Sequence, residues 1–247
     1  MKITDIIETE YANIQKTEQE LVLTDSQGID SIIQAYEEWG TKLREIFIEY
    51  NYLNKIYSMA NEIIEKKEYD RTDITAFCNH LSDFSPKCKS LLEQDKITYR
   101  GIFLSGLINL HHLKIKSNNS YHIITENMSN SLQYFGFQNA GATIFIQGNV
   151  GDFTGYEMSL GTITIFGNTN NGLGTKMFGG KIIVKGNTRD ETGNEMKGGD
   201  IFITGFTKWG TGHKMRGGTI HVLKKIKHLS VHKIDGDIYC AGKQVYS

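Results

Sequence analysis

The chain has 247 residues, of which 22% are charged and 39% hydrophobic, and its formal net charge is −1. This length suits one large domain or two modest ones, and the near-neutral charge removes the simplest argument for nucleic-acid binding over the whole surface. No apolar run approaches the roughly 20 residues of a membrane helix, and the first residues lack the apolar core of a signal peptide. The three cysteines (Cys78, Cys88 and Cys240) are scattered, which argues against a disulfide framework and against a metal site, so we expect a reducing, cytoplasmic location.

Composition divides the chain into two regions. Only 4 of the 26 glycines lie in residues 1–135. Residues 1–100 carry 12 Lys and Arg against 19 Asp and Glu (net −7), whereas residues 101–247 carry 15 against 9 (net +6). The polar stretch 116–120 has turn chemistry. We therefore predict an α + β protein in separate domains, with a helical domain over residues 1–116 and a β domain over residues 121–247.

Helical periodicity dominates the first region. Apolar residues recur at three- and four-residue steps over 3–14 and again over 29–64, which predicts one long helix or two helices joined near Gly40. A further helix is predicted over 74–81, and it must end before Pro86. Together these segments predict an N-terminal helical bundle.

The end of this region is ambiguous. Residues 99–110 suit either a buried helix or a strand, and Gly101 and Gly106 weaken both interpretations. His80 and the adjacent pair His111 and His112 are interpreted as surface or packing residues, because neighbouring helix residues point about 100° apart and cannot share a metal from one face. We predict no catalytic residue and no metal ligand here.

The second region is an internal repeat of nineteen residues, the strongest signal in the sequence. Its unit reads Ile-x-Ile/Val-x-Gly, six variable residues, then Gly-x-x-Met-x-x-Gly. Six columns keep this step, two of them the alternating apolar pair that begins with Ile144 and Ile146. Two further columns form the predicted structural framework: Gly155, Gly174, Gly193 and Gly212, and Met158, Met177, Met196 and Met215.

This repeat predicts a parallel β-helix with 19-residue coils. The alternating apolar pair is typical of a short strand with one buried face, and glycine at fixed positions suits corners where φ is positive. Stacked coils place methionine on methionine inside. Residues 121–136 resemble a degenerate first coil that the helical half could cap. At the other end Lys224 replaces a glycine, and the last coil is one residue short.

The segments 155–161, 193–199 and 212–218 resemble the GXGXG β-helix family. That family includes the C-terminal domain of the glutamate synthase large subunit and one of the subunits of formylmethanofuran dehydrogenase. The resemblance covers about residues 121–242. It implies a right-handed β-helix that holds catalytic domains or subunits together and lacks a reaction centre of its own. The acidic helical half matches neither relative.

Glycine-rich sequences can also bind nucleotides, but the spacing here argues against it. Met177 occupies the third glycine position of a dinucleotide fingerprint, and Thr175 the first glycine position of a P-loop. Asn149, Asn168 and Asn187 also keep the 19-residue step, which predicts a stacked asparagine ladder at a corner rather than a ligand site. We therefore expect no cofactor, no metal and no catalytic residue.

The leading interpretation is a non-catalytic β-helix subunit that scaffolds the catalytic subunits of a glutamate-synthase-like or related oxidoreductase assembly. Two alternatives remain. The first is an enzyme with a site at the seam between the two halves. The second is a binder of nucleic acid or an acidic ligand through the basic stretch 197–233, in which Asp200 is the one acid. Protein partners are expected, a membrane is not, nucleic acid is disfavoured, and a homo-oligomer is left open.

The six variable residues of each unit are the candidate recognition surface, because positions that repeat every coil lie on one side of a solenoid. Three of these segments begin with Asn and are mainly polar, whereas the fourth supplies Phe206, Lys208 and Trp209. An aromatic side chain beside a cation has the composition of an interface hot spot, so these three residues are the candidate partner-binding residues. The alternative role of Phe206 and Trp209 is packing on the terminal coil or on the helical half.

Overall fold

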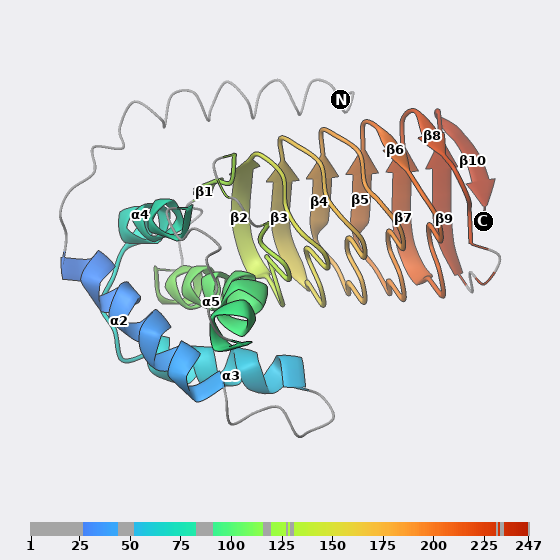
Figure 1. Ribbon diagram of the computed structural model, residues 1–247. Coiled ribbons are helices and arrows are strands. Elements are labelled where there is room, and N and C mark those ends of the chain that lie inside the picture. The colour runs from blue at the N-terminus through green and yellow to red at the C-terminus, as the bar shows by residue number, and fades with distance from the viewer. Residues whose placement is uncertain are drawn as a thin grey trace.

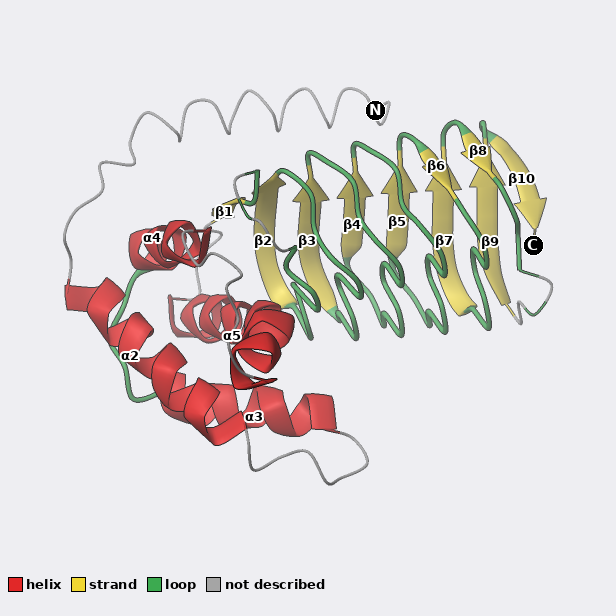
Figure 2. Ribbon diagram, in the orientation of Figure 1, coloured by secondary structure: helices red, strands yellow, loops and turns green. Residues whose placement is uncertain are grey.

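The computed structural model describes residues 27–43, 52–82, 91–115, 120–126, 128, 131–230, 232 and 235–246. The helix expected over 3–14 and most of the turn at 116–120 lie outside these residues. The described chain forms four helices followed by a parallel β-solenoid of about six turns (Figure 1). The helices gather at one end, and the coils stack away from them in chain order (Figure 2).

The helical half contains α2, α3, α4 and α5. The periodic region 29–64 forms two separate helices, and the ambiguous segment 99–110 is helical. In α4 the Asp70 carboxylate accepts hydrogen bonds from the backbone N–H groups of Thr72 and Asp73, and the Asp73 carboxylate accepts one from the N–H of Asp70, which is a reciprocal N-terminal cap. The bounds are α2 Gln27–Lys42, α3 Tyr52–Ile64, α4 Arg71–Ser82 and α5 Leu91–Ile115.

The two glycines of α5 mark places where other segments approach the helix closely. A Cβ atom on Gly101 would lie 2.0 Å from the carbonyl oxygen of Gln133, and one on Gly106 would lie 2.8 Å from Oδ1 of Asn61. Glycine therefore serves packing here at a cost in helix propensity of about 1 kcal/mol each. For this reason the sequence of residues 99–110 does not distinguish a helix from a strand.

Each solenoid coil contributes one strand to a single sheet. The order is β1-β2-β3-β4-β5-β7-β9-β10, parallel throughout except for the antiparallel pair of β9 and β10. β6 and β8 pair on another side of the coil. The bounds are β1 Ser120–Ile124, β2 Ala140–Gln147, β3 Leu160–Ile165, β4 Lys181–Val184, β5 Asp200–Ile203, β6 Phe206–Thr207, β7 Arg216–Val222, β8 Lys225–Ile226, β9 Asp235–Cys240 and β10 Lys243–Tyr246.

The strand register confirms the 19-residue coil. Ile163 pairs with Ile182, and Ile182 pairs with Ile201, so identical positions of successive repeats stack directly. The first coil is longer, since Tyr121 pairs with Ile144. The last is one residue short, since Ile220 pairs with Ile238, as the sequence indicated.

The glycine and methionine columns lie inside the solenoid and at its corners. Met158, Met177, Met196 and Met215 are all fully buried. Gly174 has φ of +64°, and a Cβ atom there would lie 2.5 Å from Cδ1 of Ile201. Gly155, Gly193 and Gly212 have the same backbone conformation, and a Cβ atom on them would lie 2.5 Å from Cδ1 of Ile182, Ile220 and Ile238, respectively. A side chain at this corner would therefore collide with the core.

The helix α5 covers the first coil. The Ser105 hydroxyl accepts hydrogen bonds from the N–H groups of Gly136 and Phe137 at 2.9 and 3.2 Å. The Asn109 amide donates to the carbonyl oxygens of Phe137 and Gln138 at 3.3 and 3.2 Å. Buried apolar side chains continue from the helices into the solenoid as one cluster. Helices and coils therefore share a core across this contact.

Candidate functional site

The corners that follow β2, β3 and β4 carry a ladder of asparagine side chains. Oδ1 of Asn149 accepts hydrogen bonds from the backbone N–H and the side-chain amide of Asn168, at 2.7 and 3.1 Å. Oδ1 of Asn168 accepts the same pair from Asn187, at 2.9 and 3.1 Å, and Oδ1 of Asn187 accepts from the N–H of Phe206 at 3.1 Å. This is the ladder expected from the sequence, and it connects the four successive coils from Asn149 to Phe206.

A second ladder runs three residues further along each corner. Oδ1 of Asp152 accepts a hydrogen bond from the N–H of Asn171 at 2.9 Å, and Oδ1 of Asn171 accepts one from Asp190 at 3.2 Å. Oδ1 of Asp190 in turn accepts from the N–H of Trp209 at 3.0 Å. This column was not predicted, although the 19-residue step from Asp152 to Asn171 to Asp190 is visible in the sequence.

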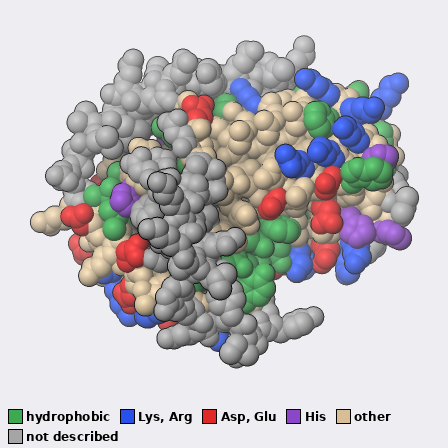
Figure 3. Space-filling view, in the orientation of Figure 1, with side chains coloured by type: hydrophobic (Ala, Val, Ile, Leu, Met, Phe, Trp, Pro, Cys, Tyr) green, Lys and Arg blue, Asp and Glu red, His purple; other side chains and the backbone are tan. Residues whose placement is uncertain are grey.

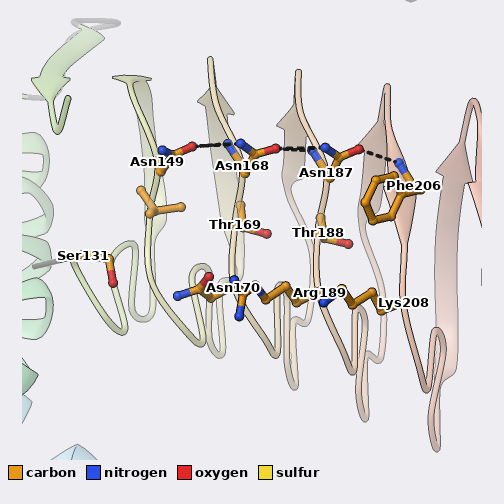
Figure 4. Close-up of a pocket in the computed structure, with 11 residues that line it drawn as sticks. Ser131, Asn149, Asn168, Thr169, Asn170, Asn187, Thr188, Arg189, Phe206 and Lys208 are labelled. Carbon is orange, nitrogen blue, oxygen red and sulfur yellow. Dashed lines mark hydrogen bonds between the residues drawn. The ribbon is translucent and has the colours of Figure 1, made fainter.

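A groove of about 440 Å³ runs along the solenoid beside the asparagine ladder (Figure 4). Side chains alternate in extended chain, so in the corner after β4 Asn187 and Arg189 face outward while Thr188 faces the interior. Asn170, Arg189 and Lys208 line the groove opposite the ladder. It extends from the coil of Ser131 to the coil of Phe206, and its remaining lining residues are Asn149, Val150, Asn168, Thr169, Asn187 and Thr188.

Three cations stack along one position of successive corners. Arg189, Lys208 and Lys227 are each nineteen residues apart, and adjacent coils are separated by about 4.8 Å. Arg189 and Lys227 are exposed and Lys208 is half-buried. The ammonium of Lys227 lies 5.3 Å from the centre of the Phe206 ring, so it reaches back toward the end of the groove. No described acid forms an ion pair with any of the three.

The three candidate partner-binding residues occupy one corner. Phe206 and Lys208 line the groove, and Trp209 follows directly. The Trp209 side chain is 60% exposed and stacks on the ring of His228 in the next coil, with ring centres 3.3 Å apart and planes inclined by 10°. Trp209 is therefore not a core residue.

Basic side chains are distributed unevenly over the surface. Figure 3 shows Lys and Arg concentrated over the coils farthest from the helices, with several histidines and a row of Asp and Glu beside them, whereas the middle coils are largely uncharged on this face. In chain order Arg189 follows β4, Lys208 follows β6 and Lys227 follows β8. The arrangement can attract and hydrogen-bond an anionic group along the groove.

The seam between the two halves holds a buried group of polar rings. Nδ1 of His111, on α5, is hydrogen-bonded to the Tyr121 hydroxyl of β1 at 2.9 Å. Their side chains are only 7% and 1% exposed. The ring of Tyr69 lies 6.0 Å from that of His111, and its hydroxyl donates to the carbonyl oxygen of Leu107 at 3.2 Å. These groups fasten α5 to the first strand, the packing role expected for His111.

Burial changes the acid–base properties of this group. It raises the pKa of Tyr121 to about 12 and lowers the pKa of His111, although the carboxylate of Asp70 opposes the second effect. Burial, followed by the charge of Arg71, also lowers the pKa of His122. The neutral forms of these side chains are therefore favoured at the seam.

Comparison with known proteins gives no relative. No protein-family model, no curated protein and no solved structure matches this chain. The described residues contain no group of three or more His, Cys, Asp or Glu side chains that could hold a metal ion. Among the described helices, none combines the length and hydropathy that a bilayer crossing needs.

Proposed function

We propose that the protein is a non-catalytic scaffold whose solenoid binds partner proteins at the corner formed by Phe206, Lys208 and Trp209. The observation that carries this proposal is the exposure of Trp209, a large aromatic side chain beside a cation and at the edge of a groove. Aromatic and basic side chains of this kind dominate the energetics of protein interfaces. His228 holds the indole in place by stacking, which lowers the entropy lost on binding.

The assembly is proposed to be that of a glutamate-synthase-like or related oxidoreductase, with the chain as its GXGXG-type, right-handed β-helix subunit. The support is the repeated Gly-x-x-Met-x-x-Gly unit at nineteen-residue spacing, in which the methionines form a buried column. In this proposal the catalytic centres lie on the partner subunits.

The helical half, residues 1–116, is proposed to be a domain that caps the β-helix of residues 121–247 and shares core contacts with it. A solenoid needs its end coils covered, because their inter-coil hydrogen bonds and core faces would otherwise be exposed. Ser105 and Asn109 satisfy backbone groups of the first coil from α5, which is the contact expected of a cap.

The scaffold proposal is tested by comparing what the full-length chain and its Trp209→Ala variant capture from native lysate. Captured proteins are identified by mass spectrometry, then purified and titrated against both chains. We expect at least one partner whose affinity falls by about tenfold or more in the variant, because truncating a hot-spot residue costs about 2 kcal/mol. The melting temperature should not change, because the indole is mostly exposed.

Phe178→Ala is the matched control. Phe178 is also an exposed aromatic (50%), with the Lys197 ammonium 4.3 Å from its ring centre, but it lies on a different side of the coil. It should leave partner affinity unchanged. Equal losses in both variants, or a large drop in the melting temperature of Trp209→Ala, would contradict this location for the interface.

A further inference from the structure

The asparagine side of the groove offers hydrogen-bond donors and few acceptors. Oδ1 of Asn168 accepts two hydrogen bonds from Asn187, so both of its lone pairs are used within the ladder. Each amide nitrogen carries two hydrogens, and Asn168 and Asn187 each donate one to the preceding rung. No described residue accepts the second hydrogen. The ladder holds the coils together and still presents a row of N–H groups beside the groove.

The opposite side of the groove supplies positive charge that the fold does not use. Like charges that stack on one another repel, yet Arg189, Lys208 and Lys227 occupy equivalent positions of successive coils without an ion pair to a described acid. The two acids of the same corner are hydrogen-bonded elsewhere. The Asp190 carboxylate accepts a hydrogen bond from the N–H of Trp209, and the Glu191 carboxylate accepts one from the side-chain amide of Asn194. Bound anions would relieve the repulsion among the three cations.

The groove has the length of a short extended segment. Its lining extends across five successive corners, from Ser131 to Phe206 and Lys208. Four steps of about 4.8 Å give a length of about 19 Å, which corresponds to about six residues of extended chain at about 3.3 Å per residue. Backbone carbonyls of such a segment suit the amide N–H row, and carboxylates suit the cationic column.

Nucleic acid suits this groove less well than a protein segment does. Single strands bind to proteins by stacking bases on open aromatic rings beside a basic groove. Here the chain itself occupies one face of each such ring, because His228 stacks on Trp209 and the Lys227 ammonium lies over Phe206. Residues 1–100 also carry a net charge of −7, which opposes a polyanion approaching the whole molecule.

We propose that the groove binds an acidic, extended segment of a partner protein, with its carboxylates on Arg189, Lys208 and Lys227 and its backbone on the amides of the asparagine ladder. This inference rests on the proposed scaffold function, because it names the kind of partner segment that the scaffold would hold.

The test measures peptide binding to the full-length chain by fluorescence anisotropy. The probe is a fluorescein-labelled decapeptide of alternating glutamate and serine, with the glutamine–serine decapeptide as its uncharged analogue. We expect saturable binding of the first peptide that weakens with added salt, and none of the second. The double variant Arg189→Gln/Lys208→Gln should bind at least about tenfold more weakly, because it removes two charge-assisted contacts.

A control of equal charge is the double variant Lys181→Gln/Lys197→Gln. These lysines lie over the rings of Phe202 and Phe178, outside the groove. The control should bind the peptide as the unmodified chain does. Equal weakening in the two double variants would overturn the proposal, because binding would then follow net charge alone. Circular dichroism melts establish that both variants are folded.

Two other results would also overturn the proposal: no binding of the glutamate peptide at millimolar concentration, or tighter binding of a ten-nucleotide thymidine strand that displaces the peptide. Failure here is distinguishable from failure of the scaffold. If the capture of a partner depends on Trp209 but its affinity is unchanged in the Arg189→Gln/Lys208→Gln variant, the scaffold proposal is supported and the groove proposal is contradicted. Peptide binding in the groove without any Trp209-dependent partner does the reverse.

Discussion

The helical half and the solenoid build their cores in opposite ways. In the helical half Tyr36, Trp39, Phe77 and Phe103 meet at ring distances of 5.2 to 5.9 Å, and each of these contacts occurs once. In the solenoid one contact is repeated: Gly155 adjoins Ile182, and Gly174 adjoins Ile201, the same pair of positions nineteen residues further on. A repeated core gives every coil the same neighbours, but it leaves the first and last coils each with one uncovered face. A unique core can be shaped to fit the first coil.

The largest expected effect comes from breaking the repeated core. Met177→Asp places a carboxylate in a fully buried column, and we expect a loss of about 4 kcal/mol or more in the free energy of unfolding, with loss of cooperative melting in the solenoid. Met177→Leu, which keeps the volume, should cost less than about 1.5 kcal/mol. Thermal melts followed by circular dichroism measure both. Wild-type-like melting of Met177→Asp would mean that the column faces solvent.

The second prediction separates the unique core from the repeated one. Residues 121–247 expressed alone lose the contacts of α5 with Phe135 and Phe137, two fully buried side chains of the first coil. We expect this fragment to be less soluble than the whole chain and to melt at a lower temperature. Light scattering and calorimetry provide the measurements. If it and residues 1–116 were each monodisperse with unchanged melting temperatures, the two would be independent domains without a cap.

The third prediction concerns pH at the contact between the halves. Burial lowers the pKa of His111 in the folded protein, so below the ordinary histidine pKa of about 6.5 the unfolded chain binds more protons than the folded one. The free energy of unfolding should therefore fall as the pH decreases from about 6.5. The charged or titratable groups around this ring are Tyr69, Asp70, Arg71, His112, Lys114 and Tyr121.

Denaturant titrations of the unmodified chain and of His111→Gln, between pH 7.5 and 5.0, measure this effect. The variant should lose less stability on acidification, although burial also lowers the pKa values of His122 and His221, so part of the slope remains. His228→Gln, at an exposed position on the solenoid, serves as the control. The same slope in His111→Gln and the unmodified chain would contradict the prediction.

The smallest expected effect comes from a substitution at Thr169, where one coil lacks a hydrogen bond that the next coil has. Oγ1 of Thr188 is hydrogen-bonded to Oγ1 of Thr192 at 2.8 Å, but one coil earlier Leu173 stands at the position of Thr192. Oγ1 of Thr169 is therefore buried without a partner among the described residues. Thr169→Val should raise the free energy of unfolding by about 1 kcal/mol, because it removes an unsatisfied hydroxyl. The column already accommodates Val150 one coil earlier.

The control substitution should change the free energy of unfolding in the opposite direction. Thr188→Val leaves the hydroxyl of Thr192 without its partner and should cost about 1 kcal/mol. Chemical denaturation of the two variants gives both values. A loss of stability in Thr169→Val as large as that in Thr188→Val would show that the two hydroxyls have equivalent surroundings.

Prediction from sequence was more successful in the solenoid than in the helical half. A 19-residue step in the chain becomes a direct neighbour in space, so the asparagine ladder could be read from Asn149, Asn168 and Asn187. In the helical half the partners are remote in sequence. Gly101 could not be interpreted until the approach of Gln133 was known, and the pairing of His111 with Tyr121 joins two elements that no repeat relates.

The groove illustrates the same division. The sequence identified Phe206, Lys208 and Trp209 as a surface cluster, because repeated positions share one side of a solenoid. Arg189 and Lys227 were not selected, although they occupy the Lys208 position of the neighbouring repeats. Their importance depends on which outward positions border a hollow, and that follows from the bend of the backbone at the corner.

The sequence by itself determined the coil length, the inward methionine column and the short last coil, because translational repetition converts spacing along the chain into contact between coils. The tertiary structure alone decided how α5 covers the first coil, which side chains line the groove, and that Trp209 stacks on His228 in solvent rather than in the core. These features depend on distances between side chains whose separation in sequence follows no period. They are fixed only when the whole chain packs.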